Sequence, residues 1–435
     1  RRTGEVVWPS VFRSAEDGLS LPVSPDLAAN RDDLVASKII DVLRLARLAP
    51  DVYVYYELLE ALRRFGGYRE GDWDRPAPDG DRDTYYVFAY DWRRDNVETA
   101  QLFIRRVEEL KRKLNRPDLR FNIVAHSMGG LVARYAAMYG EADLAAEGVA
   151  TPGPTWAGAS SINKVFMFGT PNQGSAEAFA ILLEGYSLTE GLRPRVRLFN
   201  KLTKEDIITV PSVFQLLPHR GAESFLDGEL RPLAVDLYDP AEWRRYGWSV
   251  INDAVYRERF AGGAVRSEGE QKPADGTLAD VDAYLASVLR RARRFHEALD
   301  AVDEPSAPAL MQRAPVPLFA FGGDCEETLS ALVILRDKGK NRWVTLTRPR
   351  ELRVVGNRRI STKEVTRAMY EPGDGRVTRR SLLGMRLGAA RASALFDTPL
   401  FVKYGLFVCD LHSEVQNNRT LQENALTLLM SEIIE

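Results

Sequence analysis

A serine within a small-x-Ser-x-Gly pattern offers the clearest chemistry in this sequence. Ser127 follows an apolar run that begins at Phe121 and predicts a buried strand, and it precedes a run over 128–139 that predicts a helix. A serine on such a sharp turn projects its hydroxyl away from the sheet, and the helix amino end offers unpaired N–H groups to a developing negative charge. Ala125 and Gly129 are small, as the tight turn requires. The pattern therefore predicts a nucleophile elbow, although five-residue matches also arise by chance.

A serine hydroxyl needs a base within hydrogen-bond reach, and the base needs a carboxylate to orient it. Of the four histidines, His412 lies just beyond the last predicted strand, where parallel strands end near active-site loops. His126 adjoins the serine and is expected to point away from it. His219 and His296 lie in a segment without predicted strands. His412 is therefore the candidate base, against the alternative of an ordinary hydrogen-bonded histidine.

Two carboxylates could orient this base. Asp374 lies between two glycines in a tight turn, and Asp324 directly follows a predicted strand. Both fall between serine and histidine, in the order that hydrolases with such an elbow use. The turn favours Asp374, whereas Asp324 could instead form a turn or cap a helix.

The composition is that of an ordinary globular chain. Its 435 residues, 45% hydrophobic and 28% charged, suffice for one large domain with an insertion or for two domains. A net charge of -2 gives no electrostatic basis for nucleic-acid binding, and no stretch has the apolar length of a membrane span. Cys325 and Cys409 are too few for a disulfide framework and lack the spacing of a zinc site, so both are expected to be buried, small apolar groups. No cofactor or metal is expected.

The elements that must position these residues alternate between strands and helices. In chain order they are a strand over 85–92, a helix over 97–114, the strand from Phe121, the helix over 128–139, and strands over 165–168, 317–323 and 406–409. This alternation predicts an α/β fold with a mostly parallel sheet flanked by helices. Further helices are expected over 53–65 and 421–433. We assign 1–174 and 315–435 to this core.

The segment 175–314 shows no convincing run for a parallel strand. Apolar residues over 281–299 recur at helical spacing, and four arginines face elsewhere, toward solvent or toward anionic headgroups. This pattern predicts a helical cap inserted into the sheet domain. Within the cap lies an aromatic cluster that could contact substrate lipid at a membrane interface or pack inside the cap, consisting of Trp243, Tyr246 and Trp248.

A set of short motifs follows the order seen in a known family. The motifs are Tyr90–Arg93, Ala125–Gly130, Gly169–Pro171 with Gly174–Ser175, Pro211–Val213 with Leu216–Pro218, Gly373–Gly375 with Val377, and His412–Ser413. They resemble the lecithin:cholesterol acyltransferase family, with its bacterial and plant phospholipid acyltransferase and phospholipase relatives. The resemblance implies an α/β-hydrolase fold with a helical cap, and a catalytic triad of Ser127, Asp374 and His412. It also implies that the backbone N–H of Met128 serves in the oxyanion hole. Relatives commonly carry threonine where this chain has Arg376.

The resemblance implies a second oxyanion donor that this sequence lacks. In the family, an apolar strand and a Pro-Gly loop precede the segment that matches 5–12, and the loop supplies that donor. The strand would lie between the strands over 85–92 and from Phe121, so we hypothesise that the sequence is a fragment of a longer chain. Direct pairing of those two strands would contradict this hypothesis.

Together these features predict acyl transfer through an ester on Ser127. Water as the acceptor would make the protein a lipase or phospholipase, and a lipid alcohol would make it an O-acyltransferase. The expected partner is a lipid or ester substrate, with a membrane or lipoprotein surface as a further candidate and no nucleic acid. The alternative is a hydrolase-fold protein that binds a lipid or a partner without turnover. A cytoplasmic or membrane-peripheral location is favoured over secretion.

Overall fold

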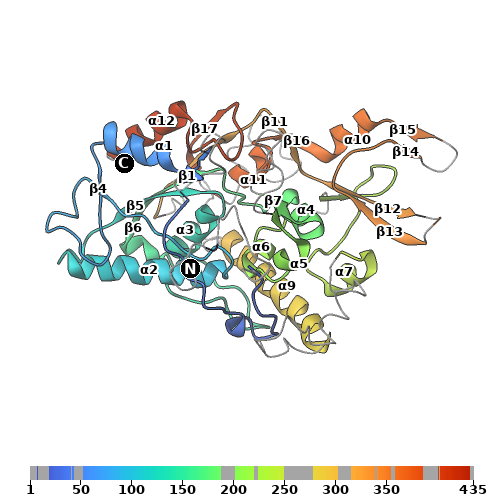
Figure 1. The fold of residues 1–435 in the computed structure, drawn as a ribbon, viewed down its shortest axis with the longest axis horizontal. Coiled ribbons are helices and arrows are strands. Elements are labelled where there is room, and N and C mark those ends of the chain that lie inside the picture. Colours follow the sequence, from blue (N-terminus) through green and yellow to red (C-terminus); the bar gives the residue numbers. More distant parts are fainter. Residues whose placement is uncertain are drawn as a thin grey trace. The chain divides into compact units, whose positions relative to one another are not determined.

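The computed structural model describes residues 7, 19–40, 42–43, 52–187, 201–219, 224–248, 278–301, 315–337, 339, 341–353, 358–385, 400 and 402–431. The chain forms two compact units (Figure 1). The sheet unit consists of Val35–Gln173, Arg294–Thr328 and Pro372–Glu435, and the accessory unit consists of Arg1–Leu34, Gly174–Arg293 and Leu329–Glu371. The accessory unit thus includes 1–34 and 329–371, which the sequence analysis assigned to the core. The cap over 175–314 stays a prediction.

Four parallel strands form the main sheet of the sheet unit. They are β5 (Phe121–His126), β6 (Ile162–Phe168), β10 (Leu318–Gly323) and β17 (Val402–Val408), in the spatial order β17-β10-β6-β5. The two central strands are almost wholly buried and mainly apolar, as expected for a parallel sheet covered on both faces. Four phenylalanines stack in pairs across them, at ring-centroid distances of 4.7 Å for Phe166–Phe319 and 4.9 Å for Phe168–Phe321.

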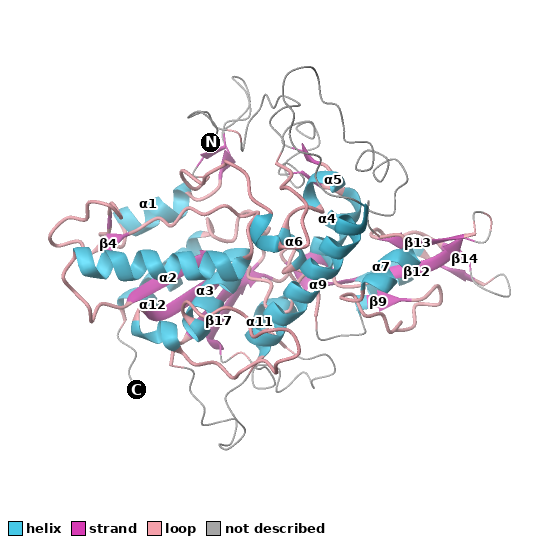
Figure 2. Ribbon diagram, turned by 90° about the horizontal axis from the view of Figure 1, so that it is seen from below, coloured by secondary structure: helices cyan, strands magenta, loops and turns pink. Residues whose placement is uncertain are grey.

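Helices cover both faces of this sheet. On one side lie α3 (Met128–Tyr139), which packs on β5 and β6, and α2 (Asn96–Lys113), which packs on α3 (Figures 1 and 2). On the other side lie α12 (Arg419–Met430), which packs on β17, and α1 (Tyr56–Arg64), which packs on α12 although it comes from near the start of the chain (Figure 1). The predicted α/β-hydrolase fold is therefore confirmed.

Apart from one helix of 23 residues, the remaining elements are short. In the sheet unit they are β1 (Val42–Leu43), β2 (Val52–Tyr53), β3 (Arg69–Glu70), β4 (Thr84–Tyr85), η2 (Ala157–Ser160) and α11 (Arg379–Leu383). In the accessory unit they are η1 (Leu27–Ala29), α4 (Ala176–Glu184), β7 (Tyr186–Ser187), β8 (Lys201–Leu202), α5 (Lys204–Ile207), α6 (Pro211–Phe214), α7 (Pro240–Tyr246), β14 (Leu352–Arg353), β15 (Arg359–Ile360) and α10 (Thr362–Met369). Residues of both units occur in α9 (Leu278–Asp300), β11 (Glu326–Leu329) and β16 (Tyr370–Gly373). No helix within the described ranges is long and apolar enough to cross a membrane.

The accessory unit has a small sheet of its own. Strand β12 (Leu332–Asp337) pairs antiparallel with β13 (Arg342–Leu346) and parallel with β9 (Phe225–Leu226), as Figure 2 shows. Helix α7 packs against β13. The sequence shows no convincing parallel-strand run over 175–314, and β9, the part of this sheet within that range, is only two residues long.

The strand predicted over 85–92 is largely absent. Only Thr84–Tyr85 form a strand, β4, and it pairs with β3 and not with the main sheet. Aromatic and β-branched residues favour strands but do not supply the neighbouring ladder that a strand requires. The rings of this segment pack against other rings instead, Tyr86 on Phe121 and Phe88 on Phe103. Among the described residues β5 is therefore the last strand of its sheet and does not pair with this segment, and the fragment hypothesis stays a prediction.

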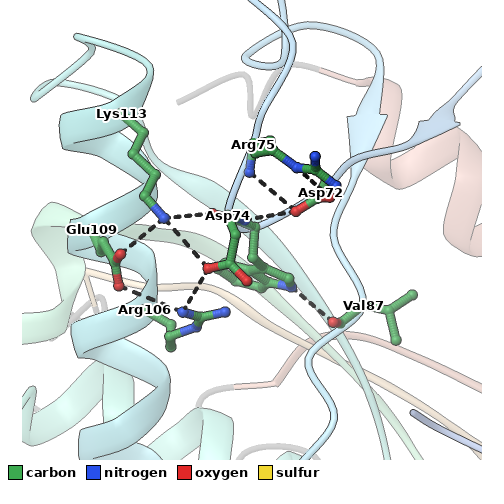
Figure 3. Close-up of polar contacts among 8 residues, drawn as sticks. Asp72, Asp74, Arg75, Val87, Arg106, Glu109 and Lys113 are labelled. Carbon is green, nitrogen blue, oxygen red and sulfur yellow. Dashed lines mark hydrogen bonds and ion pairs between the residues drawn. The ribbon is translucent and has the colours of Figure 1, made fainter. Parts of the chain in front are cut away.

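A polar network holds the loop between β3 and β4 on helix α2 (Figure 3). The Asp74 carboxylate lies 3.2 Å from an Arg106 nitrogen and 3.5 Å from Lys113 Nζ. The neighbouring Trp73 donates its indole N–H to the carbonyl of Val87 at 2.8 Å. Exposed ion pairs contribute little each, so the half-buried tryptophan is the stronger anchor of the loop.

The two cysteines form a disulfide, and the prediction that they are buried apolar groups is wrong. Cys325 and Cys409 are both exposed, and their Cα atoms lie 5.2 Å apart. They meet because β10 and β17 are neighbours whose ends are in register, Gly323 beside Val408. The Asp324 N–H also donates to the Val408 carbonyl at 3.2 Å. The disulfide thus links the carboxyl ends of two sheet strands.

We expect the paired substitutions Cys325→Ser and Cys409→Ser to lower the melting temperature. A cross-link over 84 residues removes chain entropy from the unfolded state, worth at most about 4–5 kcal/mol. Thermal unfolding of wild type and variant with and without dithiothreitol measures the effect. The reductant should lower the melting temperature of wild type alone, and equal stability of both proteins without reductant would contradict the structural role.

Candidate active site

Ser127 occupies a strained turn between β5 and α3. Its φ is +53°, in a region that residues other than glycine rarely adopt. Its backbone N–H donates to the Phe168 carbonyl at 2.7 Å, which continues the β5–β6 ladder by one residue. Gly129 was predicted to be small because the turn is tight. The stricter requirement falls on Gly130, where a Cβ would collide with Thr170. The turn is thus fixed by the sheet on one side and by close helix packing on the other.

His412 lies within hydrogen-bond distance of Ser127, as the sequence predicted. Its Nε2 is 2.9 Å from Ser127 Oγ, and its Nδ1 is 2.8 Å from Asp374 Oδ2. A carboxylate only accepts hydrogen bonds, so Nδ1 carries a proton, and in the neutral ring Nε2 accepts from the serine hydroxyl. The His412 backbone N–H also donates to the Asp374 carbonyl oxygen at 2.8 Å. Three residues from distant parts of the chain therefore form one hydrogen-bonded series.

Asp374 lies in the turn that follows β16 and is 2% exposed. Its Oδ1 accepts from the backbone N–H groups of Arg376 at 3.0 Å and Val377 at 2.7 Å. Burial alone would raise its pKa, but the His412 imidazole and these N–H groups outweigh burial and hold the pKa of Asp374 below its usual range. The carboxylate therefore stays ionised at neutral pH.

The rival carboxylate has other partners. Asp324 Oδ2 lies 3.2 Å from an Arg379 guanidinium nitrogen, and that guanidinium also packs over the ring of Phe407. The carboxylate that bonds His412 is thus that of Asp374. Turn context and the family resemblance both favoured this choice in the sequence.

Met128, the predicted oxyanion donor, is the first residue of α3. The first N–H groups of a helix have no acceptor within the helix, so this N–H is free of intrahelical bonding. The partial positive charge at the helix amino end adds to its attraction for an anion. Its role as an oxyanion donor stays a prediction.

The three aromatic residues predicted to contact substrate lie in the interior of the accessory unit. Trp243, Tyr246 and Trp248 are buried, and their rings pack on one another at centroid distances of 4.8–6.0 Å. The indole N–H groups are satisfied by the Leu237 carbonyl at 2.6 Å and by Thr345 Oγ1 at 2.7 Å. These contacts are those of a packed core, which was the alternative role weighed from the sequence.

His126 has contacts that the sequence did not reveal. As predicted, it does not serve Ser127; its Nε2 lies 2.9 Å from the His412 carbonyl oxygen and its Nδ1 lies 3.1 Å from the Tyr55 hydroxyl. Burial, aided by the neighbouring His412, lowers the pKa of His126 to about 3. The ring is therefore neutral at neutral pH. The residue is half-buried, and only its place in an apolar strand could have signalled this environment.

Comparison with known proteins agrees with the sequence motifs that lie within residues 38–232. The sheet, the elbow and the flanking helices have the arrangement of an α/β-hydrolase fold. The family model described as lecithin:cholesterol acyltransferase matches residues 38–232, which include Ser127 but not Asp374 or His412. This match confirms the family resemblance over those residues and supports a lipid acyl hydrolase or acyltransferase at the level of the family.

A chain of the solved structure titled "The crystal structure of Tle4-Tli4 complex" is similar to this chain at 15% sequence identity and a TM-score of 0.47, over 81% of this chain and 70% of that chain. No curated protein sequence matches. Among the described residues, no group of three or more His, Cys, Asp or Glu side chains could hold a metal ion.

The low pKa of His126 predicts an acid-sensitive stability. The ordinary histidine pKa of about 6.5 applies to the unfolded chain, so between about 6.5 and the folded value of about 3 the unfolded state binds more protons. Below about pH 6.5 the free energy of unfolding should then fall with decreasing pH, by at most about 1.4 kcal/mol per pH unit. Above about pH 6.5 the contribution of the neutral ring to stability is complete. The variant His126→Gln should lose this part of the slope.

Denaturant unfolding at several pH values measures the slope for wild type and His126→Gln. His219→Gln is the matched control, because it removes a histidine that lies in the accessory unit, outside the site. Parallel curves for wild type and His126→Gln between pH 6.5 and 4 would contradict the burial of a neutral ring.

Proposed function

We propose that this protein is a serine acyl hydrolase or O-acyltransferase that acts on lipid esters through an acyl-serine intermediate. The observation that carries the proposal is the hydrogen-bonded series from Ser127 through His412 to Asp374, with spacings of 2.9 and 2.8 Å. Its support at a coarser level is the family match, which includes the elbow. The same match supports a lipid or ester as the substrate.

The geometry supports a two-stage reaction. In the first stage, His412 Nε2 takes the proton of the serine hydroxyl while Oγ attacks the ester carbonyl carbon. The carbonyl oxygen becomes an oxyanion, which the Met128 N–H stabilises. The intermediate collapses as His412 returns the proton to the leaving alcohol, and the acyl group remains as an ester on Ser127.

The second stage reverses the roles of the two alcohols. His412 takes a proton from the acceptor, which attacks the acyl-serine, and the proton then returns to Ser127 Oγ. Water yields a free fatty acid, and a lipid alcohol yields a new ester. In both stages Asp374 holds the imidazole by Nδ1 and stabilises the imidazolium while its own carboxylate stays ionised, as its lowered pKa requires.

One observation favours the alternative of lipid or partner binding without turnover. Met128 is the single oxyanion donor that we identify among the described residues, and an acyl-transfer site ordinarily uses two. Loss of one such donor costs about a hundred- to a thousandfold in turnover. A protein with a formed triad and a negligible rate would then act by binding alone.

A working location in an oxidising compartment is a further part of the proposal. The disulfide joins two exposed cysteines, and cytosolic thiol systems keep such pairs reduced. This argument disfavours the cytoplasm, which is one of the two locations expected from the sequence. Thiol alkylation of the protein as it is isolated from its native cells tests it, since an oxidised pair takes up no reagent.

Labelling with a fluorophosphonate probe tests for an activated serine. Wild type should be labelled, Ser127→Ala should not, and His412→Ala should react at least about a thousandfold more slowly because the base is lost. The charge-neutral change Asp374→Asn should slow the reaction by about the same factor, because the wrong tautomer of His412 results.

Asp324→Asn is the matched control for the acid, since it makes the same chemical change outside the triad. It should be labelled at the wild-type rate. Wild-type protein that is folded yet unlabelled would reject the enzyme and leave binding, which vesicles of neutral or anionic phospholipid would then probe. If the serine is active, the ratio of free fatty acid to new ester, measured with phospholipid and a sterol or glyceride, separates hydrolysis from transfer.

A further inference from the structure

Two side chains outside the triad form a hydrogen-bond chain to the main chain of His412. The His126 ring bonds the carbonyl of His412 through Nε2 and the hydroxyl of Tyr55 through Nδ1, at 2.9 and 3.1 Å. It also packs on the His412 ring, with ring centroids 4.8 Å apart. The proton transfers described above use none of these contacts.

The direction of each hydrogen bond follows from the chemistry of the groups. A carbonyl oxygen only accepts, so Nε2 of His126 must carry a proton. Because burial keeps the ring neutral, Nδ1 has no proton and must accept, and the Tyr55 hydroxyl therefore donates. The chain runs from the Tyr55 O–H through the His126 ring to the His412 carbonyl, and it selects a single tautomer of His126.

Further hydrogen bonds join the segment at Tyr55 to the loop that carries His412. Gln416, which is fully buried, donates through Nε2 to the carbonyl oxygens of Val54 and Ser413, both at 2.7 Å. The segment 54–55 before α1 is thus bonded twice to the loop 412–416, once through His126 and once through Gln416. This loop joins β17 to α12 and has no strand or helix of its own to fix it.

We propose that Tyr55 and His126 are positioning residues for His412. This inference rests on the proposed function, in which His412 is the base. Asp374 holds the His412 N–H and the His126 ring holds the His412 carbonyl, so the backbone of the base is fixed on both sides of its Cα. With the backbone fixed, the bond from Nδ1 to Asp374 leaves Nε2 at one place, 2.9 Å from Ser127 Oγ.

The neutral state of His126 matters for the charge that His412 acquires during the reaction. Each proton transfer makes an imidazolium of His412, and its ring lies against that of His126. A second positive ring at this distance would oppose the charge. The Tyr55 hydroxyl occupies the one lone pair through which His126 could gain a proton, so it preserves both the bond to His412 and the neutrality of the neighbour.

The substitution Tyr55→Phe tests the hydrogen-bond chain, because it removes only the hydroxyl oxygen of Tyr55. Tyr404→Phe is the matched control, because it removes a hydroxyl that bonds Asn424 at 3.1 Å, on β17 of the same unit but outside the site. For each protein we would titrate the reactive serines with a fluorophosphonate and then measure hydrolysis of a short-chain p-nitrophenyl ester per titrated serine. Tyr55→Phe should be about three- to tenfold slower per titrated serine, and Tyr404→Phe should equal wild type.

The rate per titrated serine separates positioning from folding. A merely structural role of Tyr55 would reduce the number of titrated serines and leave the rate of each unchanged. That result, or a wild-type rate in Tyr55→Phe, would overturn the positioning role while leaving the proposed function intact. A folded wild-type protein that does not react at all would overturn both.

Substitutions of His126 extend the test to the next link. Glutamine can still donate an amide N–H to the His412 carbonyl, whereas leucine cannot. His126→Gln should therefore stay within about threefold of wild type per titrated serine, and His126→Leu should be slower by about tenfold or more. If the hydrogen-bond chain acts as one unit, adding Tyr55→Phe to His126→Leu should cause no further loss of rate per titrated serine. Equal rates for the glutamine and leucine variants would reject the hydrogen bond to His412 as the cause.

Discussion

The place of His412 is the constraint on which the site depends. Its backbone N–H is bound by the Asp374 carbonyl, its Nδ1 by the Asp374 carboxylate and its carbonyl by His126. These bonds come from two residues in different parts of the chain, and both residues belong to the sheet unit. His126 and His412 come together because β5 and β17 are strands of the same parallel sheet and end at one edge of it. Asp374 follows β16, which pairs with β11 outside that sheet. Such a site forms only when the strands of the sheet are in their order, because that order brings its residues together.

Asp374 shows how the site tolerates a buried charge. A carboxylate removed from water is costly unless hydrogen bonds replace the lost hydration. Here two backbone N–H groups and one imidazole N–H supply them. The tight turn that creates these N–H donors also fixes the direction of the carboxylate. Burial and orientation of the acid are therefore produced by the same few bonds.

The elbow and the hydrogen-bonded series of Ser127, His412 and Asp374 could be predicted from local sequence, chain order and the family resemblance. The predicted helix over 128–139 has the bounds of α3, and Asp374 was favoured from its flanking glycines. The prediction of a strand over 85–92 was largely wrong, because the strand preference of its residues does not supply a neighbouring strand to pair with. The disulfide was missed because Cys325 and Cys409 meet only through the order β17-β10. The part of His126 depends on a carbonyl 286 residues away, which no local pattern encodes.

The backbone of Ser127 carries a further consequence. A φ of +53° costs a non-glycine residue about 1–3 kcal/mol and costs glycine almost nothing. The residue that best suits this position for folding is therefore glycine, which has no hydroxyl. Selection for a durable protein and selection for a reactive one oppose each other at this position. Ser127→Gly should accordingly melt at a higher temperature than wild type, and the serine persists in spite of the fold, held in its strained turn by the strand before it and the helix after it.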